Sequence, residues 1–131
     1  MFAMKFTALV TVAALAQTFL LSARVGMARA KLGIDPPAMS GKPEFDKAFR
    51  IHMNTVEQLV LFLPALWLAV NVVGDLWAAS LGAVWIVGRV VYAASYRRDV
   101  KKRGPGMLVT LFSTTILTLI ALWGIIQSFL A

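Results

Sequence analysis

The chain has no cysteine, only one histidine and few charged residues. Charged residues make up 15% of its 131 residues, whereas an average soluble domain carries about 25%. The absence of cysteine excludes disulfides, thiolate metal sites and a cysteine nucleophile. A single histidine also excludes a histidine-rich metal site, so the sequence predicts no metal cofactor.

What the chain has in excess is apolar surface. Hydrophobic residues make up 60% of the sequence and the mean hydropathy is +0.78, against about 45–50% apolar residues in soluble domains. A small globule exposes too much surface to hide so many apolar side chains from water. A disordered chain, a nucleic-acid-binding domain and a disulfide scaffold are therefore poor interpretations, despite the net charge of +7. The composition predicts an integral membrane protein.

Four apolar segments account for nearly the whole chain. They are Phe6–Ala23, Gln58–Gly74 with a helix-compatible stretch before it from Phe45, Leu76–Tyr96 and Gly104–Ala131. A helix needs roughly 20 residues to cross about 30 Å of hydrocarbon, so each segment suffices if it extends a turn or two into the interface. We expect an all-α, integral membrane four-helix bundle with up-down-up-down topology, formed by residues 1–131 as a single domain.

The connections between these segments are short. Lys31–Glu44 and Arg97–Gly106 are expected to be loops because proline and glycine in them break helices, and Gly74–Asp75 predicts a tight hairpin. The first apolar segment has a second interpretation, a secretory signal peptide cleaved near Ala28-Arg29-Ala30. Its charge-free run exceeds the usual apolar region of about 7–15 residues, which favours a membrane helix.

The basic residues predict the orientation. Every Lys and Arg except Lys5 lies in or beside the first and third connections. Short loops rich in Lys and Arg stay cytoplasmic, so both termini are expected to face away from the cytoplasm. The net charge then reflects topology and attraction to anionic lipid head groups. A bacterial inner membrane or a eukaryotic endomembrane would suit a multi-pass protein of this kind.

Two polar stripes interrupt the apolar helices. Their members are Arg50, Asn54 and Glu57 before the second apolar segment, and Arg89, Tyr92 and Tyr96 in the third. Each set falls on one helical face, and the two lie at matching depth on antiparallel neighbours. An ionised side chain there costs about 2.5–3.5 kcal/mol unless it faces a partner or a wet cavity. The stripes form either a Glu57–Arg89 ion pair that only fixes packing, or a polar cleft with Arg29 and Arg103 at its cytoplasmic rim, which we favour.

The charged side chains of such a cleft indicate which kind of ligand it binds. Guanidinium groups pair bidentately with carboxylates, and Glu57 would suit an ammonium group, so a small zwitterion with excess carboxylates fits. The apolar walls would admit a lipid-soluble second molecule from the membrane. His52 lies about 200° around the helix from Arg50, so it either reaches a neighbouring subunit's site or is an interfacial histidine bonded to a backbone carbonyl.

These motifs together resemble a known family. The pattern Arg50-x-x-x-Asn54-x-x-Glu57, the segment Gly88–Tyr96 and four helices in this length are similar to the membrane-associated proteins in eicosanoid and glutathione metabolism (MAPEG). Within this family, the segment Arg50–Glu57 most resembles the bacterial branch and the transferase-three branch of the microsomal glutathione S-transferases. The resemblance covers the chain from Arg29 to the end of the fourth helix. It implies a homotrimer with three glutathione sites between subunits, open to the cytosol, and glutathione as co-substrate.

The resemblance also implies roles for single residues. It places glutathione contacts at Arg50, Asn54, Glu57, Arg89, Tyr92 and Tyr96. Arg29 and His52 correspond to positions that reach the glutathione of a neighbouring subunit. Arg103 occupies the place of the catalytic arginine that activates the thiol, and Lys102 and Arg98 are the alternatives for that role. The chain departs from the family after Glu57, where it reads Gln58-Leu59-Val60 and lacks the tyrosine contact that the resemblance leads one to expect.

The resemblance implies a membrane-bound glutathione S-transferase that conjugates glutathione to hydrophobic electrophiles, with glutathione peroxidase activity on lipid hydroperoxides as a further activity. Two alternatives remain. A non-enzymatic lipid-binding scaffold would not bind glutathione. A small four-helix multidrug exporter resembles others of its kind by a glutamate in its first helix, and here that segment contains no acid. The expected partners are glutathione, a hydrophobic lipid-soluble substrate and membrane lipids, with no nucleic acid.

Overall fold

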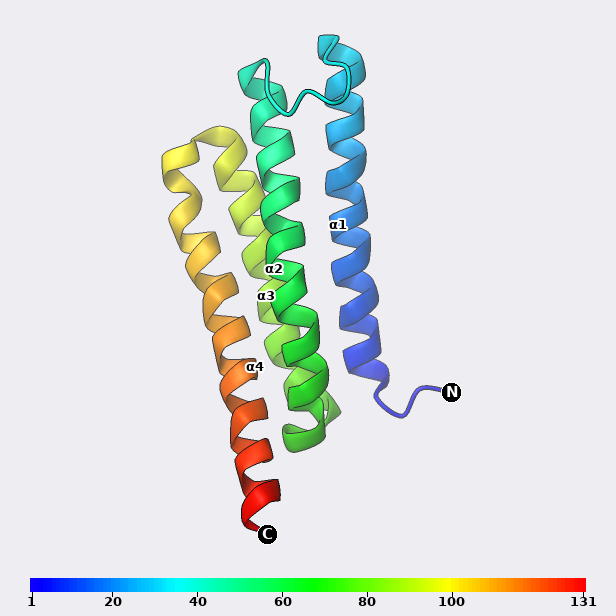
Figure 1. Ribbon diagram of the computed structural model, residues 1–131, viewed down its shortest axis with the longest axis vertical. Helices are drawn as coiled ribbons and strands as arrows, with labels where there is room; N and C mark the ends of the chain where they lie inside the picture. Colours follow the sequence, from blue (N-terminus) through cyan, green and yellow to red (C-terminus); the bar gives the residue numbers. More distant parts are fainter.

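The computed structural model describes residues 1–131 as four long helices without any strand. The helices are α1 (Lys5–Leu32), α2 (Pro43–Val73), α3 (Asp75–Arg98) and α4 (Gly104–Leu130), and a short 3-10 helix, η1 (Val100–Arg103), precedes α4. They run up, down, up and down, so both termini lie at the same end of the bundle (Figure 1). The prediction of an all-α four-helix membrane bundle is confirmed.

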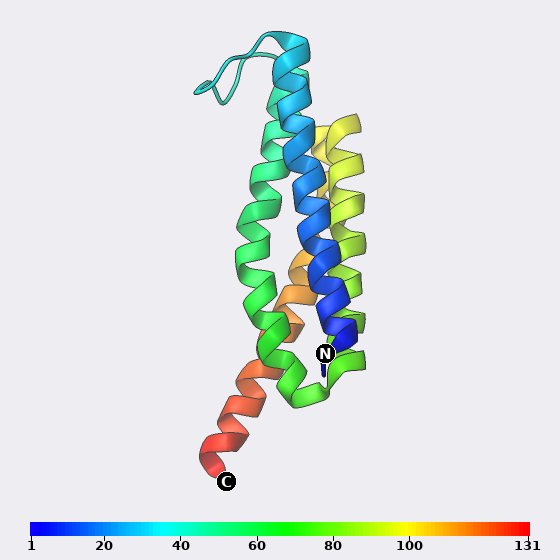
Figure 2. The same cartoon turned by 90° about the vertical axis from the view of Figure 1, so that its right-hand side faces the viewer.

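All four helices are long and apolar enough to cross a membrane. Only 17% to 44% of the residues in their most apolar windows are buried inside the chain, so most of the apolar surface faces outward, where a bilayer would cover it. The two outer helices, α1 and α4, do not contact each other and both pack against the central α2–α3 pair (Figure 2). Between α2 and α3, the rings of Phe62 and Trp85 stack in the core with centroids 4.3 Å apart.

The hairpin between α2 and α3 forms where the sequence predicts it. Gly74 alone separates the two helices and has a φ of 83°, a backbone conformation that favours glycine. The next residue, Asp75, accepts hydrogen bonds from the backbone N–H groups of Phe6 at 3.0 Å and Thr7 at 2.8 Å. These N–H groups in the first turn of α1 have no partner within their own helix, so the Asp75 carboxylate joins α3 to α1.

The sequence predicts a loop over Arg97–Gly106, and this prediction is wrong for most of the stretch. Helix α3 continues to Arg98, η1 follows, and α4 already begins at Gly104. Pro105 is tolerated in the first turn of α4 because N–H groups in a first helical turn need no intrahelical partner. A glycine is required at position 106 because a Cβ atom there would lie 2.6 Å from Cα of Tyr92. The glycine therefore permits the close approach of α4 to α3.

Candidate functional site

Arg89 is the centre of the polar region inside the bundle. Its side chain in α3 is only 1% exposed, and its Nη2 donates a hydrogen bond to Oγ1 of Thr55 in α2 at 2.7 Å. The guanidinium carbon lies 4.1 Å from the centre of the Tyr92 ring, a cation–π contact. The Nε and Nη1 atoms have no hydrogen-bond partner. A buried cation is thus held by neutral groups, with two donors left for a further partner.

The ion pair between Glu57 and Arg89, one of the two interpretations of the polar stripes, is not formed. Glu57 instead pairs with Arg50 on its own helix, with Oε1 lying 3.3 Å from Nη1. Both side chains of this pair are about half exposed, at 50% and 52%, so each charge remains accessible to a ligand. Between them on the same face, Asn54 is buried and its Oδ1 has no hydrogen-bond donor.

The two tyrosines of α3 lead from the buried arginine to the surface. Tyr92 is buried and Tyr96 is partly exposed, with ring centroids 5.6 Å apart. Tyr96 and Arg50 line one cavity of about 570 Å³, together with Met39 of the α1–α2 loop and Val100 of η1. The structure therefore brings the surface ends of both stripes together around one hollow, at the end of the bundle opposite the termini.

Arg29, expected at the rim of the cleft, holds the α1–α2 loop instead. Its Nη1 donates hydrogen bonds to the carbonyl oxygens of Ala38 at 2.7 Å and Ile34 at 3.4 Å. Its guanidinium carbon lies 4.7 Å from the centre of the Phe45 ring. Within one chain, Arg29 is therefore engaged in the loop and does not line the cavity of Arg50 and Tyr96.

The remaining two candidates also lie outside that cavity within a single chain. Arg103 is exposed at the end of η1, directly before α4, and its Nη1 donates to the carbonyl oxygen of Val100 at 2.9 Å. His52 is partly exposed and its ring makes no hydrogen bond in the chain, unlike the interfacial histidine bonded to a carbonyl that was the alternative. Arg103 is nevertheless connected to the cavity because Val100, its hydrogen-bond partner, lines it.

One residue of the site was not predicted from the sequence. Thr55 is fully buried, accepts the hydrogen bond of Arg89 and donates its own hydroxyl to the carbonyl oxygen of Ile51 at 2.8 Å. A threonine in a helix commonly bonds to its own backbone in this way. Nothing in the sequence therefore distinguishes Thr55 from a threonine without a tertiary role.

Chemically, the site offers guanidinium donors, the carboxylate of Glu57, a buried amide and two phenols. Lys47 and Asp46 also line its cavity, and Oδ1 of Asp46 already accepts a hydrogen bond from the backbone N–H of Gly41 at 2.9 Å. No group of three or more His, Cys, Asp or Glu side chains that could hold a metal ion occurs in the structure. Cations with fixed donors favour carboxylates, and the accessible carboxylate of Glu57 favours an ammonium group. The arrangement suits an acidic zwitterion more than an apolar or a cationic ligand.

Comparison with known proteins decides the family. The sequence profile described as the MAPEG family matches residues 7–123. The chain belongs to the MAPEG family. Human microsomal glutathione S-transferase 2 is 37% identical to this MAPEG chain, over 94% of the chain and 84% of the human protein. The uncharacterized protein sll1147 of Synechocystis is 42% identical, over 91% of the chain and 87% of that protein. Bovine leukotriene C4 synthase is 30% identical, over 83% and 73%.

Proposed function

We propose that this MAPEG chain is a membrane-bound glutathione S-transferase that conjugates glutathione to hydrophobic electrophiles. Relatives named microsomal glutathione S-transferase 2 and leukotriene C4 synthase support this proposal. The observation that carries it is the arrangement of Arg50, Glu57 and Arg89. Two guanidinium groups and one carboxylate stand on adjacent helices, and one of the guanidinium groups is buried with two unpartnered donors.

The charges of glutathione match this arrangement. Glutathione carries two carboxylates and one ammonium group, so Arg50 would bind a carboxylate and Glu57 the ammonium group once the ligand replaces their 3.3 Å contact. The free donors of Arg89 and the carbonyl oxygen of Asn54 would then bind further polar groups of the peptide. Tyr92 and Tyr96 would contact the ligand along the path between Arg89 and the cavity.

The proposed catalytic residue is Arg103. A thiol with an ordinary pKa of about 8.5 is mostly protonated at neutral pH, and a fixed guanidinium favours the thiolate, which is the nucleophile. The thiolate sulfur attacks the electrophilic carbon, a C–S bond forms, and the leaving group departs with its electron pair while the thiol proton passes to water. The link of Arg103 to Val100 supports this role because Val100 lines the cavity.

The same thiolate would also reduce lipid hydroperoxides. In that reaction two glutathione molecules are oxidised to one disulfide, the hydroperoxide becomes an alcohol, and water is released. The apolar substrate would reach the sulfur from the surrounding bilayer. We further propose that the connections at the α1–α2 and α3–α4 ends face the cytoplasm, so that glutathione enters from there.

A homotrimer would complete the site. Arg29 and His52 do not line the cavity of Arg50 and Tyr96 within one chain, and their proposed role is to reach the glutathione bound to a neighbouring subunit. His52 has no hydrogen-bond partner of its own in the chain, which leaves its ring free for such a contact.

Conjugate formation tests the proposal. Purified protein in detergent is mixed with glutathione and an aryl chloride, and the thioether product is measured by mass spectrometry. We expect product with the unaltered chain, a raised KM for glutathione in Arg50→Ala and a reduced kcat in Arg103→Ala. Lys5→Ala, a cation removed at the opposite end of the bundle, is the control and should match the unaltered chain. Absence of product together with absence of glutathione binding would favour the lipid-binding scaffold.

A further inference from the structure

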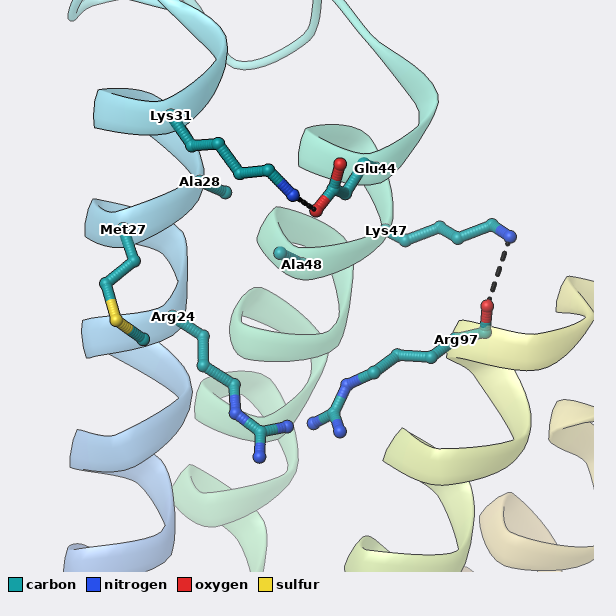
Figure 3. Close-up of a pocket in the computed structure, with 8 residues that line it drawn as sticks. All are labelled: Arg24, Met27, Ala28, Lys31, Glu44, Lys47, Ala48 and Arg97. Carbon is teal, nitrogen blue, oxygen red and sulfur yellow. Dashed lines mark hydrogen bonds and ion pairs between the residues drawn. The ribbon is translucent and has the colours of Figure 1, made fainter.

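A second cavity lies between α1, α2 and α3, at the end of the bundle that carries the basic connections (Figure 3). It has a volume of about 540 Å³, and none of the predicted glutathione contacts lines it. Its charged lining residues are four cations and a single carboxylate, namely Arg24, Lys31, Lys47, Arg97 and Glu44. Lys47 also lines the cavity of Arg50 and Tyr96, but Arg24, Lys31 and Arg97 do not. The second cavity therefore carries an excess of positive charge that the proposed transferase site does not use.

Two of the four cations have no partner in the chain. Lys31 pairs with Glu44 at 3.0 Å, and Nζ of Lys47 donates to the backbone carbonyl oxygen of Arg97 at 3.2 Å. The guanidinium groups of Arg24 and Arg97 extend toward each other across the gap between α1 and α3 (Figure 3), and neither belongs to an ion pair. Two like charges that converge without a carboxylate between them form a site for an anion.

A narrower hollow of about 190 Å³ begins at the same two arginines and follows the α1–α3 surface toward the membrane interior. The two helices line this hollow with the same pattern. In each helix an arginine lines it together with the residues three, four and seven positions earlier, most of which are apolar or small. The two rows are Gln17, Leu20, Leu21 and Arg24 in α1, and Val90, Ala93, Ala94 and Arg97 in α3. Because α1 and α3 run in the same direction (Figure 2), each row ends in its arginine on the same side.

We propose that Arg24 and Arg97 bind the phosphate of an anionic phospholipid, and that the α1–α3 groove holds the upper part of one acyl chain. Basic pockets between membrane helices bind anionic lipid head groups, and arginine pairs bidentately with phosphate oxygens. A soluble anion would use the arginines but not the apolar groove, which spans seven residues or about 10 Å along the helices. The small side chains of Ala93 and Ala94 keep this groove open. This site goes beyond the proposed glutathione chemistry and does not depend on it.

Lipid retention measured by native mass spectrometry tests the proposal. Detergent-delipidated protein is incubated with phosphatidylglycerol or phosphatidylcholine, and bound lipid is counted. We expect retention of phosphatidylglycerol over phosphatidylcholine, and an affinity about tenfold lower or more in the double variant Arg24→Gln with Arg97→Gln, as the loss of two basic contacts predicts. The matched control, Arg98→Gln with Lys101→Gln, removes two exposed cations from the same end but outside both hollows, and should retain the lipid.

A second variant separates the lipid from a soluble anion. Ala94→Leu fills the groove without changing the charge, and Ala94 is exposed, so the helices should stay intact by circular dichroism while phosphatidylglycerol is lost. Inorganic phosphate in excess should not displace the lipid. Displacement by phosphate, or full retention in Ala94→Leu, would overturn the proposal in favour of a soluble anion. Equal loss in the Arg98–Lys101 control would show attraction to net charge only. No retention at all, as expected if a second copy of the chain covers the groove, would also overturn it.

Discussion

Arg89 donates a hydrogen bond from Nη2 to the hydroxyl of Thr55 at 2.7 Å, and this contact joins α3 to α2 beside Asn54. The partner is neutral, so the positive charge of Arg89 is not compensated by a carboxylate. A buried charge without a counterion is costly, and an anionic group that enters the bundle at this point would relieve that cost. The Arg89–Thr55 contact therefore both positions the guanidinium and leaves its charge available to a ligand.

Thr55→Val should destabilise the bundle. Valine has a similar shape but no hydroxyl, so it leaves Nη2 of Arg89 without its acceptor. Hydrogen bonds between membrane helices are modest and those to charged groups are stronger, which predicts a loss of about 1–2 kcal/mol. Thermal unfolding in detergent measures it. Thr118→Val is the matched control because Thr118 is exposed and its hydroxyl bonds only to its own helix, at Thr114; an equal loss there would contradict the role of Thr55.

Gly106→Ala should disturb the proposed site through Tyr92. A Cβ atom at this position would lie 2.6 Å from Cα and 2.9 Å from Cβ of Tyr92, so α4 must move away from α3. We expect lower thermal stability and weaker glutathione binding together. Gly26→Ala serves as the control, since nothing lies within 4 Å of a Cβ atom there and alanine favours a helix over glycine by up to about 1 kcal/mol. If Gly106→Ala behaved like Gly26→Ala, the close packing would be refuted.

The sequence alone predicts the fold well because the bilayer restricts the possible structures so strongly. Four apolar runs of sufficient length allow little other than four helices, and Gly74 shows where α2 turns into α3. The end of α3 is harder to predict. Pro105 breaks a helix in its interior but suits its first turn, and the need for glycine at position 106 depends on the tertiary approach of Tyr92, which no local pattern records.

The candidate site is less predictable than the fold. Helical periodicity places Arg50 and Glu57 on one face, and the structure pairs them. Periodicity does not fix the rotation of α3 about its axis, so it cannot tell whether Arg89 meets Glu57 or Thr55. The sequence likewise does not predict that Arg24 lies near Arg97 without an ion-pair partner, because this depends on the packing of α1 beside α3. In the sequence, Arg24 resembles any other basic residue near a membrane surface.

The orientation in the membrane can be tested directly because the chain has no cysteine. All basic residues except Lys5 lie at or near the end opposite the termini, which predicts that this end is cytoplasmic. A single cysteine introduced at Gly41 should resist an impermeant thiol reagent added to intact cells. A single cysteine placed after Ala131 should react. The reverse pattern would contradict cytoplasmic entry of glutathione.

Mixed oligomers test whether the site is shared between subunits. Arg50→Ala and His52→Ala subunits are expected to bind glutathione weakly on their own, because each lacks a different side of every site. Co-expressed, they should form some sites that contain both an intact Arg50 and an intact His52, and so recover part of the binding. No recovery, or a dimeric mass in detergent, would argue against a trimer with shared sites.

Glutathione binding and thiol activation are both measured by the near-ultraviolet difference spectrum of glutathione titrated into the purified protein at neutral pH. A thiolate absorbs there and a thiol does not, so the signal reports both binding and activation. We predict a saturable thiolate signal that Lys5→Ala preserves. Arg103→Ala should lose most of this signal while keeping much of the glutathione affinity, since Arg50 and Arg89 still hold the carboxylates. A signal that does not saturate, or no signal at all, would contradict the proposed glutathione chemistry.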